Sequence, residues 1–104
     1  MEKNLGYGFY PTHPGEVVKD ELEARGITQK QFAQESGISK TALNEILNGR
    51  WDLTAATALI FEAVLDIPAD SLMKLQTKYN MYQARHDESL MERIKKISRS
   101  VAAL

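Results

Sequence analysis

The sequence predicts an all-α fold, and three observations lead to that prediction. Apolar residues recur at helical spacings of three and four along most of the chain. Polar capping residues or prolines stand just before these periodic stretches, and no segment alternates apolar and polar residues over the length of a strand. We therefore expect an N-terminal arm over residues 1–13, a five-helix domain over residues 14–84 and a C-terminal amphipathic helix over residues 85–104.

The composition excludes several classes of protein. The chain has 104 residues, 43% of them hydrophobic, which is enough for one compact domain with a core. It has no cysteine, and its two histidines, His13 and His86, are far apart, so we expect no metal and no cofactor. No segment approaches the roughly 20 apolar residues of a membrane span. The N-terminus also lacks the continuous apolar stretch of a secretory signal, so we expect a cytoplasmic protein. Because the sequence has no Gly-rich phosphate loop, no zinc motif and no cysteine, we expect no catalytic activity.

The first two helices have clear start and stop signals. Pro14 suits a first helical turn because its φ is fixed and it lacks an N–H, and Gly26 can end the helix after Arg25. The second helix begins with a capping box, in which Thr28 is the N-cap and Gln31 lies three positions later. These two helices are therefore short and closely spaced.

The third helix follows a tight turn. Gly37 supplies a left-handed stop to the second helix, and Ser39 caps the third, which ends at "NGR". The apolar residues of the third helix fall at i, i+3 and i+4 and form one buried face: Leu43, Ile46 and Leu47.

Two further helices complete the predicted domain. The fourth, capped by Thr54, is apolar nearly all round in "AATALIFEAVL" and is expected to be the central, most buried helix. Pro68 opens the fifth. Its apolar face is spaced by three, four and three: Leu72, Leu75, Tyr79 and Tyr82.

The C-terminal helix has an apolar seam. After a break in "ARHDE", Ser89 and Glu92 predict a capping box. The seam residues then alternate spacings of four and three, the period of helix-to-helix packing: Leu90, Ile94, Ile97, Val101 and Leu104. A helix this short is marginal alone in water. The seam must therefore pack on a second subunit, on its own domain or on another protein, and we favour the second subunit.

Two short helices joined by a tight glycine turn match a helix-turn-helix, in which the second helix lies in the major groove of DNA. If the apolar face of the third helix points to the core, its opposite face is entirely polar. That face contains Lys40, Thr41, Asn44, Glu45 and Asn48. Residues 26–50 are also the only block with a net positive charge. The pattern indicates a surface that reads DNA.

The polar residues of this face suit contacts with DNA bases. Asn44 can pair bidentately with adenine, and Lys40 can reach guanine or a phosphate. Thr41 can touch a thymine methyl group or hydrogen-bond a phosphate. Glu45 either accepts from a cytosine amino group or repels phosphates and so narrows the choice of sites.

The residues around this face are expected to help position the DNA backbone. Gln29 lies in the first turn of the second helix, where it and exposed N–H groups could hold a phosphate. Ser39 is short and lets the end of the third helix approach the duplex closely. Lys30 and Arg50 add positive charge at the flanks.

The stretch "TQKQFAQESGISKTALNEILNGR" resembles the Cro/repressor (XRE) helix-turn-helix family. The preceding "HPGEVVKDELEARGITQKQFAQ" resembles the HigA/VapI antitoxin branch, and the resemblance covers residues 13–81. It implies a five-helix repressor-like helix-turn-helix domain with a C-terminal extension helix. It also implies a homodimeric repressor that binds operator DNA and a small HigB-like ribonuclease toxin. Asp66 stands where this family often has a glycine.

Two other functions fit the same residues. One is a stand-alone transcriptional regulator without a toxin, which the sequence does not separate from an antitoxin. The other is a protein-interaction module in which the helix-turn-helix supports a protein partner, and Glu45 favours it slightly.

The aromatic residues outside the core pattern have two interpretations. Trp51 is either an exposed anchor for a partner or, as we favour, packed over the end of the third or fourth helix. Tyr7, Phe9 and Tyr10 form either a flexible arm or a strap over the helical core.

Overall fold

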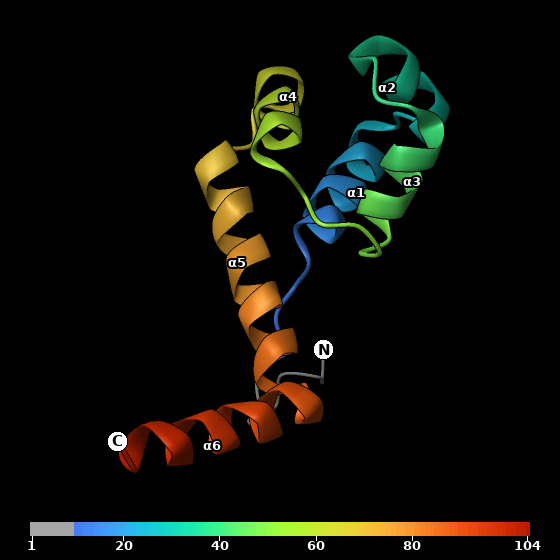
Figure 1. Cartoon of the computed structure of the whole chain (residues 1–104). Helices are drawn as coiled ribbons and strands as arrows, with labels where there is room; N and C mark the ends of the chain where they lie inside the picture. The colour runs from blue at the N-terminus through green and yellow to red at the C-terminus, as the bar shows by residue number, and fades with distance from the viewer. Residues whose placement is uncertain (1–9) are drawn as a thin grey trace.

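Six helices form most of the chain in the computed structural model, which describes residues 10–104 (Figure 1). In chain order they are α1 (Pro14–Arg25), α2 (Gln29–Ser36), α3 (Lys40–Leu47), α4 (Ala55–Leu65), α5 (Ala69–Arg85) and α6 (Glu88–Ala102). No strand occurs in residues 10–104. The predicted all-α fold, with five helices and a C-terminal extension helix, is confirmed. None of the helices in this part of the chain is both long and apolar enough to cross a membrane.

Most helices begin and end at the predicted residues. The hydroxyl of Thr28 accepts from the N–H of Gln31, and the Gln31 side chain accepts from the N–H of Thr28, which completes the capping box of α2. Ser39 and Thr54 cap α3 and α4. Gly37 ends α2 with a φ of 79°. Local sequence therefore fixes the short connections between α2, α3 and α4.

One cap was predicted wrongly. The side chain of Asp87 accepts from the N–H of Leu90, so Asp87 is the N-cap of α6 and the predicted capping box of Ser89 and Glu92 is wrong. Aspartate caps a helix as well as serine does. The earlier start also adds helical hydrogen bonds, beginning with the N–H of Met91 donating to the Asp87 carbonyl at 3.0 Å.

The hydrophobic core joins α1 to α5. Its buried residues are Val18, Leu22, Phe32, Leu43, Ile46, Leu47, Leu53, Ala58, Phe61, Leu65, Ala69 and Leu72. The predicted inward face of α3 is confirmed in full. The aromatic rings of Phe32 and Phe61 meet with centroids 5.7 Å apart, which ties α2 to α4. Of the predicted inward residues of α5, Leu72 is buried, whereas Leu75, Tyr79 and Tyr82 are half-buried.

The prediction that α4 is the most buried helix is wrong. Its buried residues are Ala58, Phe61 and Leu65, which lie on one face. On the other side Leu59 is 60% exposed and Val64 46% exposed. Helical periodicity reports how many faces of a helix are apolar, but not which of them the rest of the chain covers. Asp66, at the end of α4, adopts the left-handed φ of 59° that glycine usually supplies.

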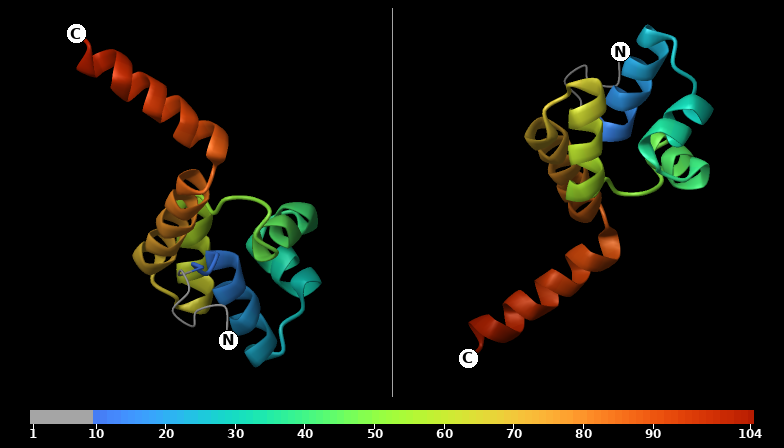
Figure 2. Two further views of the ribbon diagram at one scale, coloured as in Figure 1. Left: turned by 90° about the horizontal axis from the view of Figure 1, so that it is seen from below. Right: turned by 90° about the horizontal axis from the view of Figure 1, so that it is seen from above.

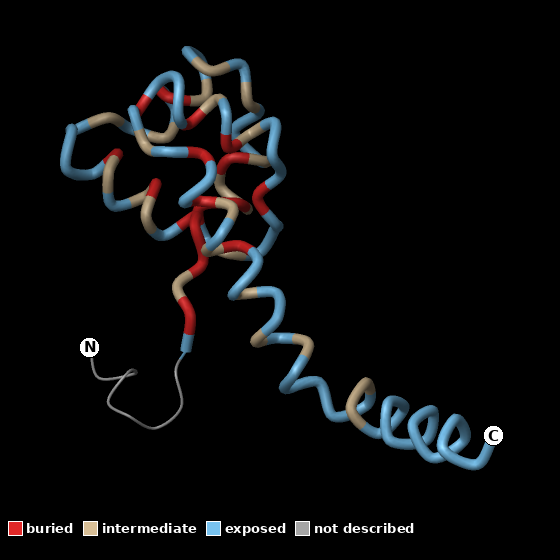
Figure 3. The backbone as a smooth tube through the Cα atoms, turned by 90° about the vertical axis from the view of Figure 1, so that its left-hand side faces the viewer, coloured by how far each residue is buried: buried red, intermediate tan, exposed pale blue. Residues whose placement is uncertain are grey.

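The C-terminal helix α6 turns away from the end of α5 and projects from the other helices (Figures 1 and 2). No residue of α6 is buried, and Figure 3 shows its backbone exposed along most of its length. Within the predicted seam Leu90 is half-buried. The other members are exposed: Ile94, Ile97, Val101 and Leu104. In this structure, therefore, the seam does not pack on its own domain.

The residues before α1 lie against α5. Pro11 is buried, and the ring of Tyr10 meets the ring of Tyr82 edge to face with centroids 5.3 Å apart. This packing supports the strap interpretation for Tyr10. Tyr7 and Phe9 lie outside the described residues.

Candidate nucleic-acid interface

The helices α2 and α3 form the predicted helix-turn-helix. The inward face of α3 packs on α1 and α2, and its polar face points away from the core. Gly37 permits the turn between the two helices because its φ of 79° lies in the left-handed region. The polar face of α3 is thereby presented on a rigid support.

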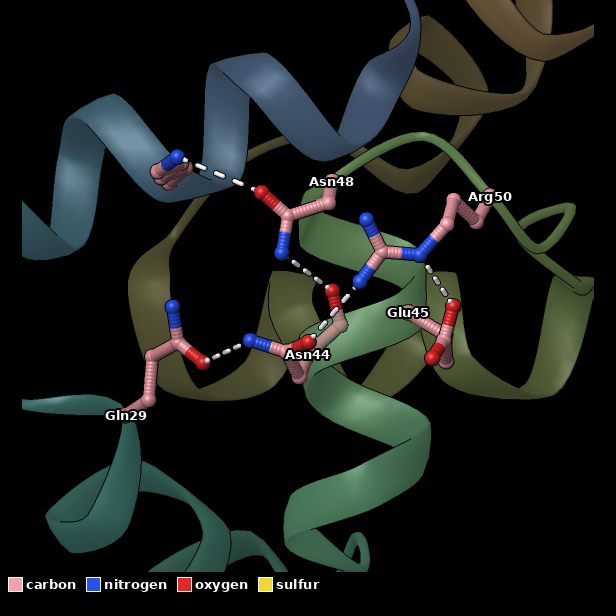
Figure 4. A network of polar contacts seen from close by, with 6 residues as sticks. Gln29, Asn44, Glu45, Asn48 and Arg50 are labelled. Carbon is pink, nitrogen blue, oxygen red and sulfur yellow. Dashed lines mark hydrogen bonds and ion pairs between the residues drawn. The ribbon is translucent and has the colours of Figure 1, made fainter.

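Asn44 lies at the centre of a hydrogen-bond network on this face (Figure 4). Its side-chain Nδ2 donates to Oε1 of Gln29 at 3.2 Å, and its Oδ1 accepts from Nη2 of Arg50 at 3.1 Å. Arg50 also donates through Nε to Oε1 of Glu45 at 2.6 Å and forms an ion pair with it. One amide therefore connects α2, α3 and the turn that follows α3.

Asn48 extends this network toward α1. Its Nδ2 donates to the backbone carbonyl of Asn44 at 2.9 Å, and its Oδ1 accepts from Nζ of Lys19 at 3.4 Å. The sequence did not indicate Lys19 as a site residue, because the pattern of an amphipathic helix does not show which residue from another part of the chain will lie next to a given lysine. It brings a further positive charge to the end of α3.

The other predicted DNA-binding residues lie outside the network. Ser39 acts as a helix cap, because its hydroxyl accepts from the N–H of Ala42 at 3.0 Å. Lys30, Lys40 and Thr41 are exposed. Within residues 10–104, the side chains of Lys40 and Thr41 bond to no other residue, so both are available to an external ligand.

Two predictions about this surface need revision. Neither alternative for Glu45 included its ion pair with Arg50, which depends on how the chain turns after α3. Trp51 is 50% exposed, so the favoured interpretation, in which it packs over a helix end, is not met. Its backbone N–H donates to the carbonyl of Glu45 at 3.2 Å, which helps to hold the turn.

His13 is a buried helix cap at the start of α1. Its Nδ1 accepts from the N–H of Gly15 at 2.9 Å, and its ring meets the ring of Tyr79 edge to face at 4.9 Å. Burial lowers the pKa of the His13 imidazole below the ordinary value of 6.5, so the ring is neutral near pH 7. No group of three or more potential metal ligands occurs in the described part of the chain.

Comparison with known proteins identifies relatives along most of the chain. Residues 18–72 match the family model described as helix-turn-helix. Virulence-associated protein A' of Dichelobacter nodosus is 31% identical over 74 residues, which cover 70% of this chain and 64% of that protein. The chain thus spans slightly less than two thirds of that relative's length.

Solved structures of similar fold include antitoxins. An addiction module antidote protein of the HigA family from Coxiella burnetii is 29% identical, with a TM-score of 0.69 over 88% of this chain and 95% of that one. The antitoxin HigA of Pseudomonas aeruginosa, solved with the higBA promoter, is 26% identical, with a TM-score of 0.71 over 83% and 92%. The predicted resemblance is confirmed. Because the family match covers more than half of its residues, the chain belongs to the helix-turn-helix family.

Proposed function

We propose that the protein is a sequence-specific DNA-binding transcriptional repressor and the antitoxin of a HigBA-type toxin–antitoxin system. One observation carries the proposal: a polar face of α3, centred on Asn44, is presented outward by a helix-turn-helix. In this motif the second helix enters the major groove and its N-terminal residues contact base edges. The protein would act by binding, without a catalytic step.

The proposed DNA-binding residues divide by the kind of contact they suit. The residues proposed to contact DNA or to position those that do are Gln29, Lys30, Ser39, Lys40, Thr41, Asn44, Glu45, Asn48 and Arg50. Lys40 and Thr41 stand in the first turn of α3, where exposed side chains suit base edges or phosphates. Asn44 retains one N–H and one lone pair, which suit adenine. The solved Pseudomonas aeruginosa antitoxin with its promoter supports operator DNA as the partner.

We also propose that the repressor is a homodimer joined through the seam of α6. An exposed row of apolar side chains on a projecting helix is unfavourable in water and marks a protein interface. Two-fold symmetry would place two α3 helices on half-sites about 34 Å apart along the duplex. In this arrangement residues 1–13 form an arm, residues 14–84 the DNA-binding domain and residues 85–104 the dimerising helix of a cytoplasmic protein.

The second proposed partner is a HigB-like ribonuclease toxin, and the similarity to HigA-family proteins supports it. If the product of the neighbouring reading frame is such a toxin, it should stop the growth of cells that express it alone. Co-expression of this protein should restore their growth, and the two proteins should co-purify as a complex. A neighbour that is not toxic and does not bind would leave a repressor without a toxin.

The DNA-binding proposal is tested with duplexes that the protein selects from a random-sequence pool. The affinity for the selected duplex should fall steeply with salt, because neutralised phosphates release counterions. In a mobility-shift assay Asn44→Ala should cost about 1–3 kcal/mol on that duplex, and Lys40→Ala should also weaken binding. Lys74→Ala, on the exposed surface of α5, is the matched control and should bind like the parent. If both α3 variants also bound like the parent, α3 would not read the bases.

A further inference from the structure

The amide of Asn44 is held in one of its two possible orientations. A guanidinium has only donors, so the Asn44 atom that faces Nη2 of Arg50 at 3.1 Å must be the oxygen. The nitrogen then faces Oε1 of Gln29 at 3.2 Å and donates to it. Arg50 thereby determines which end of the amide is the donor and which is the acceptor.

This orientation matters because a side-chain amide reads a base through both of its ends. After the two internal bonds, Asn44 has one N–H and one oxygen lone pair left, the combination that adenine recognition requires. Rotating the amide by half a turn would exchange the donor and the acceptor. At an adenine that fits one orientation, the flipped amide would set its N–H against the N6–H donor and its oxygen against the N7 acceptor.

The position of Arg50 is itself fixed by Glu45 and by the turn after α3. Gly49 has a φ of 75°, which reverses the chain and returns Arg50 to the side of α3. The backbone N–H of Arg50 donates to the Glu45 carbonyl at 2.8 Å, and its Nε donates to the Glu45 carboxylate at 2.6 Å. The Glu45 side chain is only 26% exposed. An exposed ion pair contributes little free energy to the stability of the fold. Favouring one of two amide orientations, however, requires only a small difference in free energy.

We propose that Arg50, held by Glu45, is a positioning residue that sets the base preference of Asn44, rather than a phosphate contact. This inference rests on the proposed DNA-binding function. The two polar contacts of Arg50 direct its guanidinium toward the protein, because one nitrogen is bonded to Glu45 and another to Asn44. The role of Glu45 is then to anchor Arg50, which is neither of the roles expected from the sequence.

The two roles of Arg50 predict different measurements. A phosphate contact contributes the same binding free energy on every DNA sequence. Losing it makes the fall of log affinity with log salt concentration shallower, by about 0.9 in the slope. A positioning role leaves that slope unchanged and lowers discrimination at one base pair. A bidentate contact discriminates about 5- to 150-fold against the wrong base, so the expected loss is measurable.

The experiment uses the full-length protein and the duplex that it selects from a random-sequence pool. Asn44→Ala first identifies the base pair at which discrimination disappears. Arg50→Ala should then lower discrimination at that base pair to a few-fold, keep it at the other positions and keep the salt slope. Arg50→Lys should give discrimination between that of the parent and that of Arg50→Ala, because an ammonium also has only donors but lacks the planar fork whose separate nitrogens bond Glu45 and Asn44. Glu45→Ala should lower discrimination at the same base pair.

A double-mutant cycle provides the sharpest comparison. If Arg50 acts through Asn44, Arg50→Ala should lower the affinity for the selected duplex in the parent but have no further effect on that affinity in the Asn44→Ala background. Equal effects in both backgrounds, or a parent-like preference with a shallower salt slope, would overturn this inference but leave DNA binding intact. A parent protein that selects no duplex would overturn the proposed function and this inference together.

Discussion

Gly15 and Ile46 bring the start of α1 against the end of α3 so closely that no side chain fits between them. A Cβ atom on Gly15 would lie 1.9 Å from the carbonyl oxygen of Ile46 and 2.9 Å from its carbonyl carbon. Both are backbone atoms, so they cannot move aside as the end of a flexible side chain would. This contact fixes the distance between α1 and the helix proposed to read DNA.

Gly15→Ala should therefore destabilise the protein. Alanine gains about 1 kcal/mol over glycine in a helix interior, but less in a first turn, while overpacking a rigid contact costs about 1–3 kcal/mol. Because the clash is with backbone, we expect a net loss in the free energy of unfolding, measured by urea denaturation. Asp20→Ala, on the exposed side of α1, is the control and should stay within about 0.5 kcal/mol of the parent. A Gly15→Ala variant as stable as the parent would show that α1 and α3 can separate freely.

Acid should destabilise the protein through His13. Burial lowers the pKa of its imidazole, although the backbone of Trp51 and the carboxylates of Asp52 and Glu16 oppose the shift. The unfolded chain then binds more protons, so this contribution to stability is complete above pH 6.5 and is lost as the pH falls from 6.5 toward the folded-state pKa. Protonation of Nδ1 also removes the acceptor that caps α1 through Gly15. The melting temperature should fall over this range.

His13→Asn isolates this effect, because asparagine is a good N-cap that does not titrate. Its melting temperature should depend less on pH below 6.5 than that of the parent. If the melting temperatures of the parent and of His13→Asn depended equally on pH, the loss of stability in acid would come from groups other than His13.

Gln76 holds the connection between α3 and α4 on α5. Its buried side chain accepts from the N–H of Leu53 at 2.7 Å and donates to the side chains of Asp52 and Asn80. Gln76→Leu would keep the volume but leave the Leu53 N–H unpaired, which costs about 1–3 kcal/mol in the free energy of unfolding. Calorimetry should detect that loss. Gln83→Leu, on the exposed surface of the same helix, should change stability little, and a similar result for both variants would contradict this account.

Dimerisation through α6 is tested by removing the helix or charging its seam. Truncation after Asp87 and Ile94→Asp in the full chain should each shift the molar mass from light scattering toward the monomer and weaken operator binding. Lys95→Asp, on the basic outer side of α6, is the matched control and should remain dimeric. If both seam variants remained dimeric and bound DNA with unchanged affinity, the dimer interface would instead lie on the exposed apolar face of α4 or on α5.

The sequence by itself determined the helices, most of their boundaries and the polar outward face of α3. These features are local: the capping box joins Thr28 to Gln31 across three residues, and Gly37 ends α2 through its own φ. The spacing of apolar residues also placed one side of α3 in the core without any tertiary information. The family resemblance could be read from the same stretch, because the residues that carry it are contiguous in the sequence.

The tertiary structure alone decided which residues meet across the chain. Lys19 reaches Asn48 from 29 positions away, and the positive φ of Gly49 returns Arg50 to Asn44. It also decided that only one apolar face of α4 is covered and that the seam of α6 projects. Periodicity specifies which side chains share a face of a helix. It does not specify what packs on that face, because this depends on how the remaining helices are placed around the core.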